Sequence, residues 1–225
     1  MCPNSVQVLG APSPDVVVLG TVTVVVTVFV LPQPATANAN PSANATPTAL
    51  LTTDRIRPQS SSGCEDLGVP DTFEIRPARE SDRMPLALLF AGVAEELDWI
   101  ATEPPVDVGR RAAAWTIEAI VVAVADEEIA GFLHLERSRH GYGEVALAVA
   151  PEYRGYGIGT ALLEVAIDTA RAEGLHKLSL SVFAHNEGAI GLYRKLGFVE
   201  EGRRVKHYRR ADGGLWDSVD MGLLL

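Results

Sequence analysis

The 225-residue sequence predicts an α/β fold in which a mixed, mostly antiparallel sheet is flanked by helices. Two observations support this prediction. Residues 119–125 and 129–137 are short apolar segments separated by an acidic turn, as in an antiparallel hairpin. Residues 160–172 have the apolar spacing of an amphipathic helix and lie between two further strand patterns. The predicted order of elements is β-α-α-β-β-β-α-β-α-β-β.

Composition divides the chain into two parts. Residues 32–53 are rich in Ala, Asn, Pro and Thr and too poor in core-forming side chains to fold. We therefore expect residues 1–70 to be a disordered, low-complexity extension, with a later start near Val69 as an alternative explanation of the change in composition. Its apolar run, residues 16–31, is shorter than a bilayer span of about 20 residues. Asp15 stands where an export signal carries positive charge, so we expect a cytoplasmic protein without a membrane anchor, export being the alternative. Residues 71–225 suit one domain.

Three elements are expected before the hairpin. Residues 73–76 (FEIR) alternate as a short strand that a proline ends. Ser81 or Asp82 caps a helix that runs to about residue 97, and a second helix follows at about 106–114. The acidic residues at the end of the first helix are expected to be solvated, with attraction of an ammonium ion as the alternative. These residues are Glu95, Glu96 and Asp98.

After the hairpin, residues 144–149 form the next strand of an antiparallel meander. The long helix ends at Gly174, and residues 178–183 form the strand that follows it. The chain closes with a hairpin that turns at residues 212–214. The basic residues of this hairpin are expected to form a solvated face, with contact to a phosphate or an acidic partner as the alternative. They are Arg203, Arg204, Lys206, Arg209 and Arg210.

The segment VAPEYRGYGIGTALL, residues 149–163, joins a strand to the long helix through a loop with three glycines. Glycines allow the backbone to approach a ligand closely, and the first N–H groups of a helix have no partner inside it. With the helix dipole, these groups favour an anion, and Thr160 can donate its hydroxyl from the first turn. No lysine follows the glycines, so a nucleoside-triphosphate loop is disfavoured. An ordinary strand-to-helix turn is the alternative.

A second pattern, NEGAIGLYRKLGF, covers residues 186–198. Asn186 suits an N-cap, Gly197 suits the position just after the helix, and the apolar residues between them form a stripe. Tyr193 lies seven residues after Asn186, almost two turns on, so both project from one face of this helix.

The glycine loop with its preceding Arg154 resembles motif A of the GNAT (Gcn5-related N-acetyltransferase) family, and residues 186–198 resemble its motif B. The resemblance covers about residues 72–225. It implies a GNAT fold whose glycine-loop strand separates from its later neighbour, and acetyl-CoA as co-substrate in the resulting cleft. The residues that it implies for binding acetyl-CoA are Val149, Arg154, Gly155, Tyr156, Gly157, Ile158, Gly159, Thr160 and Asn186.

Direct acetyl transfer from a thioester to an amine requires a base, an acid and a donor to the carbonyl oxygen. The resemblance implies that Tyr193 protonates the leaving thiolate, a buried core tyrosine being the alternative. It also implies that Glu144 deprotonates the amine through water, a solvent-facing strand end being the alternative. Glu136 and His134 are further candidate bases. A backbone N–H near Val149 is expected to polarise the carbonyl.

Composition limits the remaining choices. The formal net charge of −10 argues against a nucleic-acid partner and permits a cationic amine. Cys2 and Cys64 both precede the domain, and the five histidines are scattered, so no metal site is expected. The sequence therefore predicts an N-acetyltransferase for a small primary amine, with a homodimer as a candidate assembly. A protein N-terminus or lysine is an alternative acceptor, and a non-catalytic acyl-CoA-binding regulatory module is an alternative of another class.

Overall fold

The computed structural model describes residues 73–225 and confirms the predicted order of elements. The expected disorder of residues 1–70, with the apolar run at 16–31, lies outside the described residues. Within those that are described, no helix is both long and apolar enough to cross a membrane. The main elements are β1 (Glu74–Pro77), α1 (Arg83–Glu95), α2 (Val108–Ala114), β2 (Ile120–Ala125), β3 (Glu128–Arg137), β4 (Tyr142–Val149), α3 (Ile158–Ala172), β5 (Lys177–Phe183), α4 (Glu187–Lys195), β6 (Val199–Arg209) and β7 (Leu215–Leu224).

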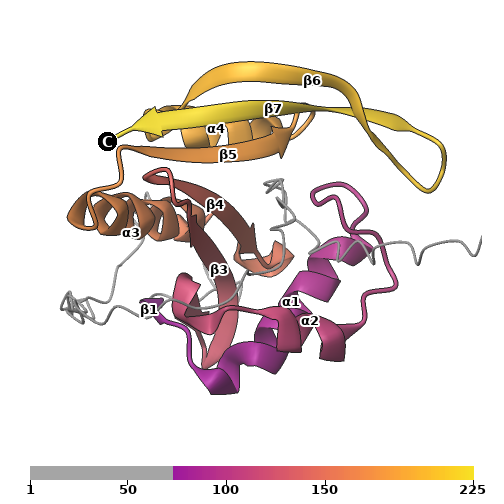
Figure 1. The fold of residues 1–225 in the computed structure, drawn as a ribbon. Helices are drawn as coiled ribbons and strands as arrows, with labels where there is room; N and C mark the ends of the chain where they lie inside the picture. Colours follow the sequence, from indigo (N-terminus) through magenta and orange to yellow (C-terminus); the bar gives the residue numbers. More distant parts are fainter. Residues whose placement is uncertain (1–72) are drawn as a thin grey trace, which may run out of the picture.

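Within residues 73–225, the seven strands form one sheet in the order β1-β2-β3-β4-β5-β7-β6. Every neighbouring pair is antiparallel except β4 and β5, which run parallel. Their register covers Tyr142, Gly143 and Glu144 of β4 and ends there, so the two strands separate toward their carboxyl ends. Figure 1 shows the consequence, because β4 continues alongside β3 while β5 lies with β6 and β7. The separation that the resemblance implied is therefore present.

Helices cover both faces of the sheet. On one face, Trp115, which follows α2, packs against Phe132 of β3 with ring centroids 5.2 Å apart. On the other face, a Cβ on Gly131 of β3 would lie 3.3 Å from Ile158, so α3 packs closely there. Side chains of β4 alternate between these faces. Glu144 therefore faces the side of α1 and α2, and Val149 faces the side of α3.

The turns follow the local sequence signals. Asp126 and Glu127 take φ of 49° and 66° at the tip of the β2–β3 hairpin, where a tight turn needs the left-handed region. Gly174 ends α3 with φ of 75°, and Leu175 N–H donates to the Ala170 carbonyl across the end of the helix (2.9 Å). These turns lie directly before β3 and just before β5.

The start of α1 is fixed by a buried ion pair that allows a test of the fold. The Asp82 carboxylate accepts from Nη1 and Nη2 of Arg76 (2.7 and 3.1 Å) and from the backbone N–H of Arg79 (2.7 Å). Hydrogen bonding from Arg76 lowers the pKa of this carboxyl below its usual 3.8. We expect Asp82→Asn to reduce the free energy of unfolding by about 2 kcal/mol, because Arg76, largely buried, would lose its carboxylate partner.

The effect should depend on pH in one direction. A lowered pKa in the folded chain means that the stabilisation is complete above about pH 4 and is lost as the pH falls through the folded value. Urea unfolding of wild type and Asp82→Asn should therefore differ at pH 6, and the difference should shrink as the pH falls below 4. Glu80→Gln is the matched control, because the Glu80 side chain is 71% exposed. Equal losses in the two variants would contradict the prediction.

Candidate active site

A cavity of about 590 Å³ lies at the carboxyl end of β4, between the glycine loop, the start of α3 and α4. The fold brings nine of the sequence-predicted site residues together here, although they come from separate segments of the chain. They are Val149, Arg154, Gly155, Gly157, Ile158, Gly159, Thr160, Asn186 and Tyr193. Tyr156 and Glu144 do not line this cavity.

Two glycines of the loop take backbone conformations that other residues rarely adopt. Gly155 and Gly157 have φ of 85° and 84°, in the left-handed region. A Cβ at either position would meet nothing within 4 Å, so the backbone, not lack of space, favours glycine. Gly157 is also the N-cap of α3, whose first N–H groups have no partner within the helix. This end of the cavity therefore suits an anion.

Arg154 links the glycine loop to the end of α1. Its Nη1 and Nη2 donate to the two carboxylate oxygens of Glu96 (2.7 and 2.6 Å), and its Nε donates to the Val149 carbonyl (3.0 Å). Nε1 of Trp99 also donates to Glu96 (2.8 Å), and Trp99 lines the cavity. Glu96 was expected to lie in a solvated helix end. No local pattern reveals its pairing with Arg154, because the two residues are 58 positions apart.

The helix α4 contributes Asn186 and Tyr193. The predicted N-cap is present, since Oδ1 of Asn186 accepts from Ala189 N–H (3.1 Å). Tyr193 is 1% exposed and packs against Phe198, with ring centroids 5.9 Å apart. Burial raises the pKa of the Tyr193 hydroxyl well above its usual 10.0, so the phenol stays protonated at neutral pH. A protonated phenol that lines a cavity can donate a proton to a group bound there.

The edge of β4 that faces β5 carries backbone groups into the region where the strands separate. Ala150 N–H donates to the Ala130 carbonyl (2.9 Å), so even-numbered residues of this strand direct their backbone groups toward β3. Those of Leu147 and Val149 point the other way, toward β5, beyond the end of the shared register. The backbone N–H expected near Val149 therefore lies on the edge that faces the opening.

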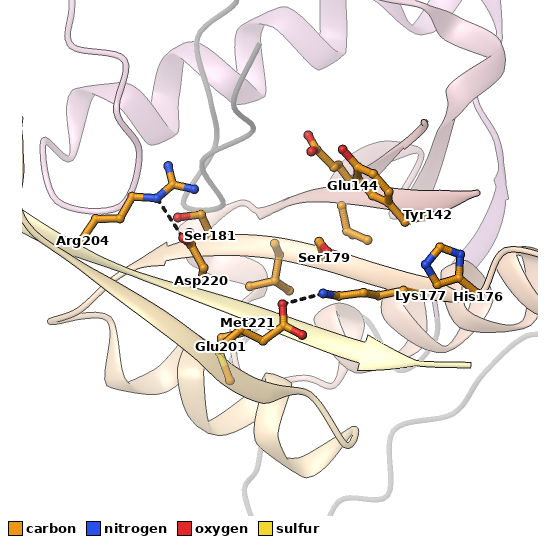
Figure 2. Close-up of a pocket in the computed structure, with 12 residues that line it drawn as sticks. Tyr142, Glu144, His176, Lys177, Ser179, Ser181, Glu201, Arg204, Asp220 and Met221 are labelled. Atoms are coloured by element: carbon orange, nitrogen blue, oxygen red, sulfur yellow. Dashed lines mark hydrogen bonds and ion pairs between the residues drawn. The ribbon is translucent and has the colours of Figure 1, made fainter. Parts of the chain in front are cut away.

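Glu144 lines a second cavity, of about 360 Å³, next to the point where β4 and β5 separate (Figure 2). Burial raises the pKa of the Glu144 carboxyl above its usual 4.5, and the charge of Glu136 raises it further. A hydrogen bond from Tyr142 and the charge of Arg204 act in the opposite direction. A half-buried carboxyl with a raised pKa is suited to accept a proton in the chemistry of a site.

Two ion pairs share the second cavity with Glu144. Nζ of Lys177 lies 2.6 Å from Glu201, and Nε of Arg204 lies 2.8 Å from Asp220. In Figure 2 these pairs lie on the strands of the carboxyl-terminal half, while Glu144 comes from β4. Three carboxylates thus line this cavity against one lysine and one arginine, which leaves an excess of negative charge.

The other two candidate bases share a face with Glu144, since Glu136 is its direct partner on β3 and His134 lies two residues before it. Burial lowers the pKa of His134 to about 4, and the charges of Arg111 and Arg137 contribute in the same direction. The ring is therefore neutral at pH 7 and a weak base. Glu136 is exposed and lies outside the lining of the second cavity.

The lining of the two cavities also differs from the predicted site at three residues of the glycine loop and α4. Tyr156 lies outside the lining of both cavities, whereas Tyr153 and Lys195, which were not predicted, line the first. Lys195 follows Tyr193 by two positions in motif B, so its place in that motif was the available signal. Among residues 73–225, no group of three or more His, Cys, Asp or Glu side chains is arranged to hold a metal ion.

The known proteins that the chain resembles are acetyltransferases. A profile described as "Acetyltransferase (GNAT) family" matches residues 92–198. The L-methionine sulfoximine/L-methionine sulfone acetyltransferase of Pseudomonas aeruginosa is 30% identical over 140 residues, 57% of this chain and 81% of that protein. The mycothiol acetyltransferase of Paenarthrobacter aurescens is 34% identical over 151 residues, 62% of this chain. These residues make up 46% of that relative, so the chain spans less than half of its length.

A solved structure supports the same relationship. The ribosomal-protein-alanine N-acetyltransferase from Brucella melitensis superimposes with a TM-score of 0.62 at 28% identity, covering 67% of this chain and 99% of that one. The profile match, the relative covered over most of its length and the shared fold confirm what the two motifs predicted. The chain belongs to the GNAT family of N-acetyltransferases, whose co-substrate is acetyl-CoA.

Proposed function

We propose that the chain transfers the acetyl group of acetyl-CoA directly to a primary amine while both substrates are bound. The observation that carries this proposal is the separation of β4 from β5 between two differently equipped cavities. The glycine-loop cavity holds Tyr193, and the cavity beside it holds Glu144. Direct transfer needs no covalent enzyme intermediate, because holding both reactants in place is itself a large rate advantage.

The glycine-loop cavity is the proposed acetyl-CoA site. The first N–H groups of α3 and the hydroxyl of Thr160 would hold the pyrophosphate, at the end of the cavity that suits an anion. Gly155 and Gly157 have open space around their Cα atoms, so nothing obstructs a phosphate there. Arg154 would add positive charge nearby. Its guanidinium is held by Glu96, so its position is fixed before the substrate binds.

The proposed reaction removes two protons from the acceptor nitrogen and adds one to the thiolate of CoA. Glu144 accepts one from the ammonium group of the acceptor through water, and the free amine forms the new C–N bond at the thioester carbon. The backbone N–H near Val149 stabilises the oxyanion that develops. The C–S bond then breaks, and Tyr193 protonates the departing thiolate of CoA. The second proton of the acceptor nitrogen returns to the Tyr193 oxygen as the amide forms, and Glu144 releases its proton to water, so both residues are restored. A raised pKa serves both residues, because it makes Glu144 a stronger base and keeps Tyr193 protonated.

A small amine is the proposed acceptor. The excess negative charge around Glu144 attracts an ammonium group, and a volume of about 360 Å³ suits a small molecule. The Pseudomonas relative is named for small amino-acid analogues. A protein N-terminus is the second candidate, since the Brucella relative is named for a ribosomal protein. A cytoplasmic location fits an enzyme that consumes acetyl-CoA.

The first test is release of free CoA thiol from acetyl-CoA by the full chain. The acceptors would be amino acids, diamines, polyamines and short peptides with a free N-terminus or a lysine, with the rate lacking acceptor subtracted. Release with small amines is the expected result, while release with peptides alone would favour the protein acceptor. Tight binding of acetyl-CoA without release across the panel would instead favour a non-catalytic binding module. Failure to bind acetyl-CoA would overturn the proposal.

Tyr193→Phe tests the proposed acid. The variant keeps the ring and removes only the proton donor, so kcat should fall by about 100-fold or more while the Kd for acetyl-CoA changes less than about twofold. Tyr153→Phe is the matched control, because Tyr153 lines the same cavity and should retain its turnover. A kcat of Tyr193→Phe equal to that of the wild type would remove Tyr193 from the mechanism.

The pH profile tests the proposed base. Glu144 must be deprotonated to act, so kcat/KM should rise with pH through an apparent pKa above the ordinary 4.5. Glu144→Gln should lower kcat/KM by about 100-fold and remove this limb of the profile. Glu136→Gln should keep the activity and move the limb to lower pH, because it removes a charge that raises the pKa of Glu144. An unchanged limb in Glu144→Gln would assign the base elsewhere.

A further inference from the structure

Arg210, next to the turn of the β6–β7 hairpin, differs from its basic neighbours. The expectation for this hairpin was a solvated basic face. Arg203 and Arg204 are partly exposed and pair with Asp217 and Asp220. The Arg210 side chain, in contrast, is 4% exposed, so the expectation is wrong for this residue. A buried guanidinium is costly unless its charge and its donors are matched.

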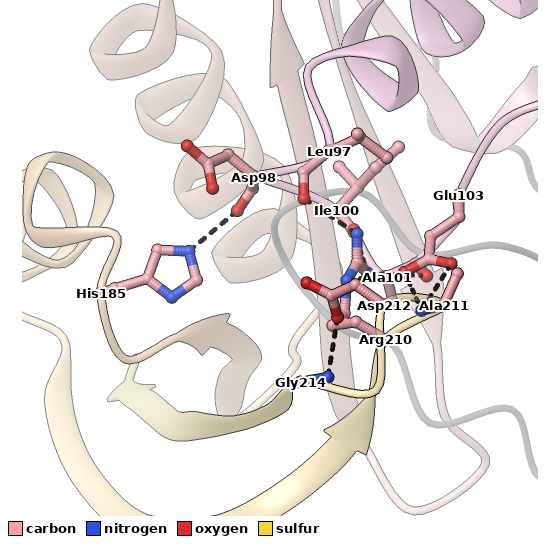
Figure 3. A network of polar contacts seen from close by, with 10 residues as sticks. All are labelled: Leu97, Asp98, Ile100, Ala101, Glu103, His185, Arg210, Ala211, Asp212 and Gly214. Carbon is pink, nitrogen blue, oxygen red and sulfur yellow. Dashed lines mark hydrogen bonds and ion pairs between the residues drawn. The ribbon is translucent and has the colours of Figure 1, made fainter.

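The matching groups come from one short segment after α1, residues 96–103, which we call the 96–103 loop. Nη2 of Arg210 donates to the carbonyl of Leu97 (2.9 Å), and Nη1 donates to those of Ile100 (3.1 Å) and Ala101 (3.2 Å). Its Nε lies 2.8 Å from the carboxylate of Glu103. Figure 3 shows the guanidinium reaching from the hairpin into this loop. One side chain thus binds the loop at four residues.

Further contacts fix both partners. Ala211 N–H donates to the carboxylate of Glu103 (3.0 Å), so the hairpin backbone also binds the loop. The Arg210 guanidinium lies over the ring of Trp216, 4.4 Å from its centroid. Leu97 has φ of 62°, a conformation that residues other than glycine seldom adopt, and Arg210 binds its carbonyl. Arg210 therefore holds the loop in a shape that its own backbone preferences disfavour.

The same loop forms part of the glycine-loop cavity. Glu96 binds the guanidinium of Arg154, and Trp99 lines the cavity while donating to Glu96. The carbonyl of Asp98, between them, accepts from Nε2 of His185 in the turn after β5 (2.9 Å). Along this loop, Glu96 and Trp99 shape the cavity. The residues between them, Leu97 and Asp98, bind Arg210 and His185 of the carboxyl-terminal half.

We propose that Arg210 is a positioning residue for acetyl-CoA, acting through the 96–103 loop. It has no contact with the cavity of its own. By fixing Leu97, Ile100, Ala101 and Glu103, it sets where Glu96 and Trp99 stand against the glycine loop. This inference rests on the proposed function, because it takes that cavity to be the acetyl-CoA site. Loss of Arg210 weakens acetyl-CoA binding more than it slows the chemical step.

The test compares Arg210→Ala with Arg203→Ala in the full chain. Arg203 lies in the same hairpin, pairs with Asp217 and has a side chain that is 54% exposed. In Arg210→Ala, we expect faster amide hydrogen exchange in peptides covering residues 97–103. The Kd for acetyl-CoA should rise about tenfold by calorimetry, and KM for acetyl-CoA should rise more than kcat falls. Arg203→Ala should match the wild type in all three measurements.

Two milder variants cover the case in which Arg210→Ala does not fold. Arg210→Lys can still pair with Glu103 but cannot reach all three carbonyls, so its Kd should lie between those of the wild type and the alanine variant. Glu103→Gln keeps an acceptor for Ala211 N–H and removes the carboxylate charge, so the Kd should shift in the same direction by less. A purely structural role would lower Tm in these variants without changing either Kd.

The outcomes separate the two proposals. Unchanged exchange in residues 97–103, or faster exchange with an acetyl-CoA Kd within twofold of the wild type, overturns the positioning role. A wild-type chain that does not bind acetyl-CoA overturns the proposed function instead. In that case the exchange data still decide whether Arg210 holds the loop.

Discussion

The short parallel register between β4 and β5 is the constraint on which the rest of the site depends. Backbone pairing ends at Glu144, and the two strands then diverge while each remains paired on its other side. Divergence exposes the backbone edge of Leu147 and Val149, which a complete sheet would have used for its own hydrogen bonds. The glycine loop and α4 lie beside this opening because the loop directly continues β4. The absence of backbone hydrogen bonds between β4 and β5 beyond Glu144 thus produces both the cavity and its backbone donors.

The sheet also gives the two proposed proton-transfer groups different surroundings. Tyr193 is enclosed by apolar side chains of α4 and its neighbours, and burial alone raises its pKa. Glu144 lies in a cavity with several charged side chains. There partial burial and the neighbouring Glu136 raise its pKa, and Tyr142 and Arg204 limit the shift. The surroundings favour the protonated form in both cases, but a phenol starts near 10 and a carboxyl near 4. The same physical effect therefore suits the phenol to donate a proton and the carboxyl to accept one.

The parts that sequence predicted are those with local causes. Asn186 caps α4 through its own third neighbour, and Gly174 ends α3 through its own backbone conformation, so short patterns suffice. Tyr156 shows the limit, because its place between two left-handed glycines gives no indication of which way its side chain turns. The pairs Glu96–Arg154 and Arg210–Leu97 join residues 58 and 113 positions apart. Such pairs depend on how helices and hairpins pack, and no local pattern records this.

The divergence of β4 and β5 leaves the two halves of the sheet without backbone hydrogen bonds beside the glycine-loop cavity, and contacts of the 96–103 loop join the halves there. The backbone ladder connects the amino-terminal and carboxyl-terminal halves of the sheet at the start of β4 and β5, but not beside the cavity. At that end, Glu96 binds Arg154, next to β4, while Asp98 binds His185 in the turn after β5 and Glu103 binds Arg210 next to the hairpin turn. Side chains thus join the halves where backbone hydrogen bonds are absent. These contacts help to set the width of the opening, so a buried arginine far from the glycine loop bears on the shape of the cavity.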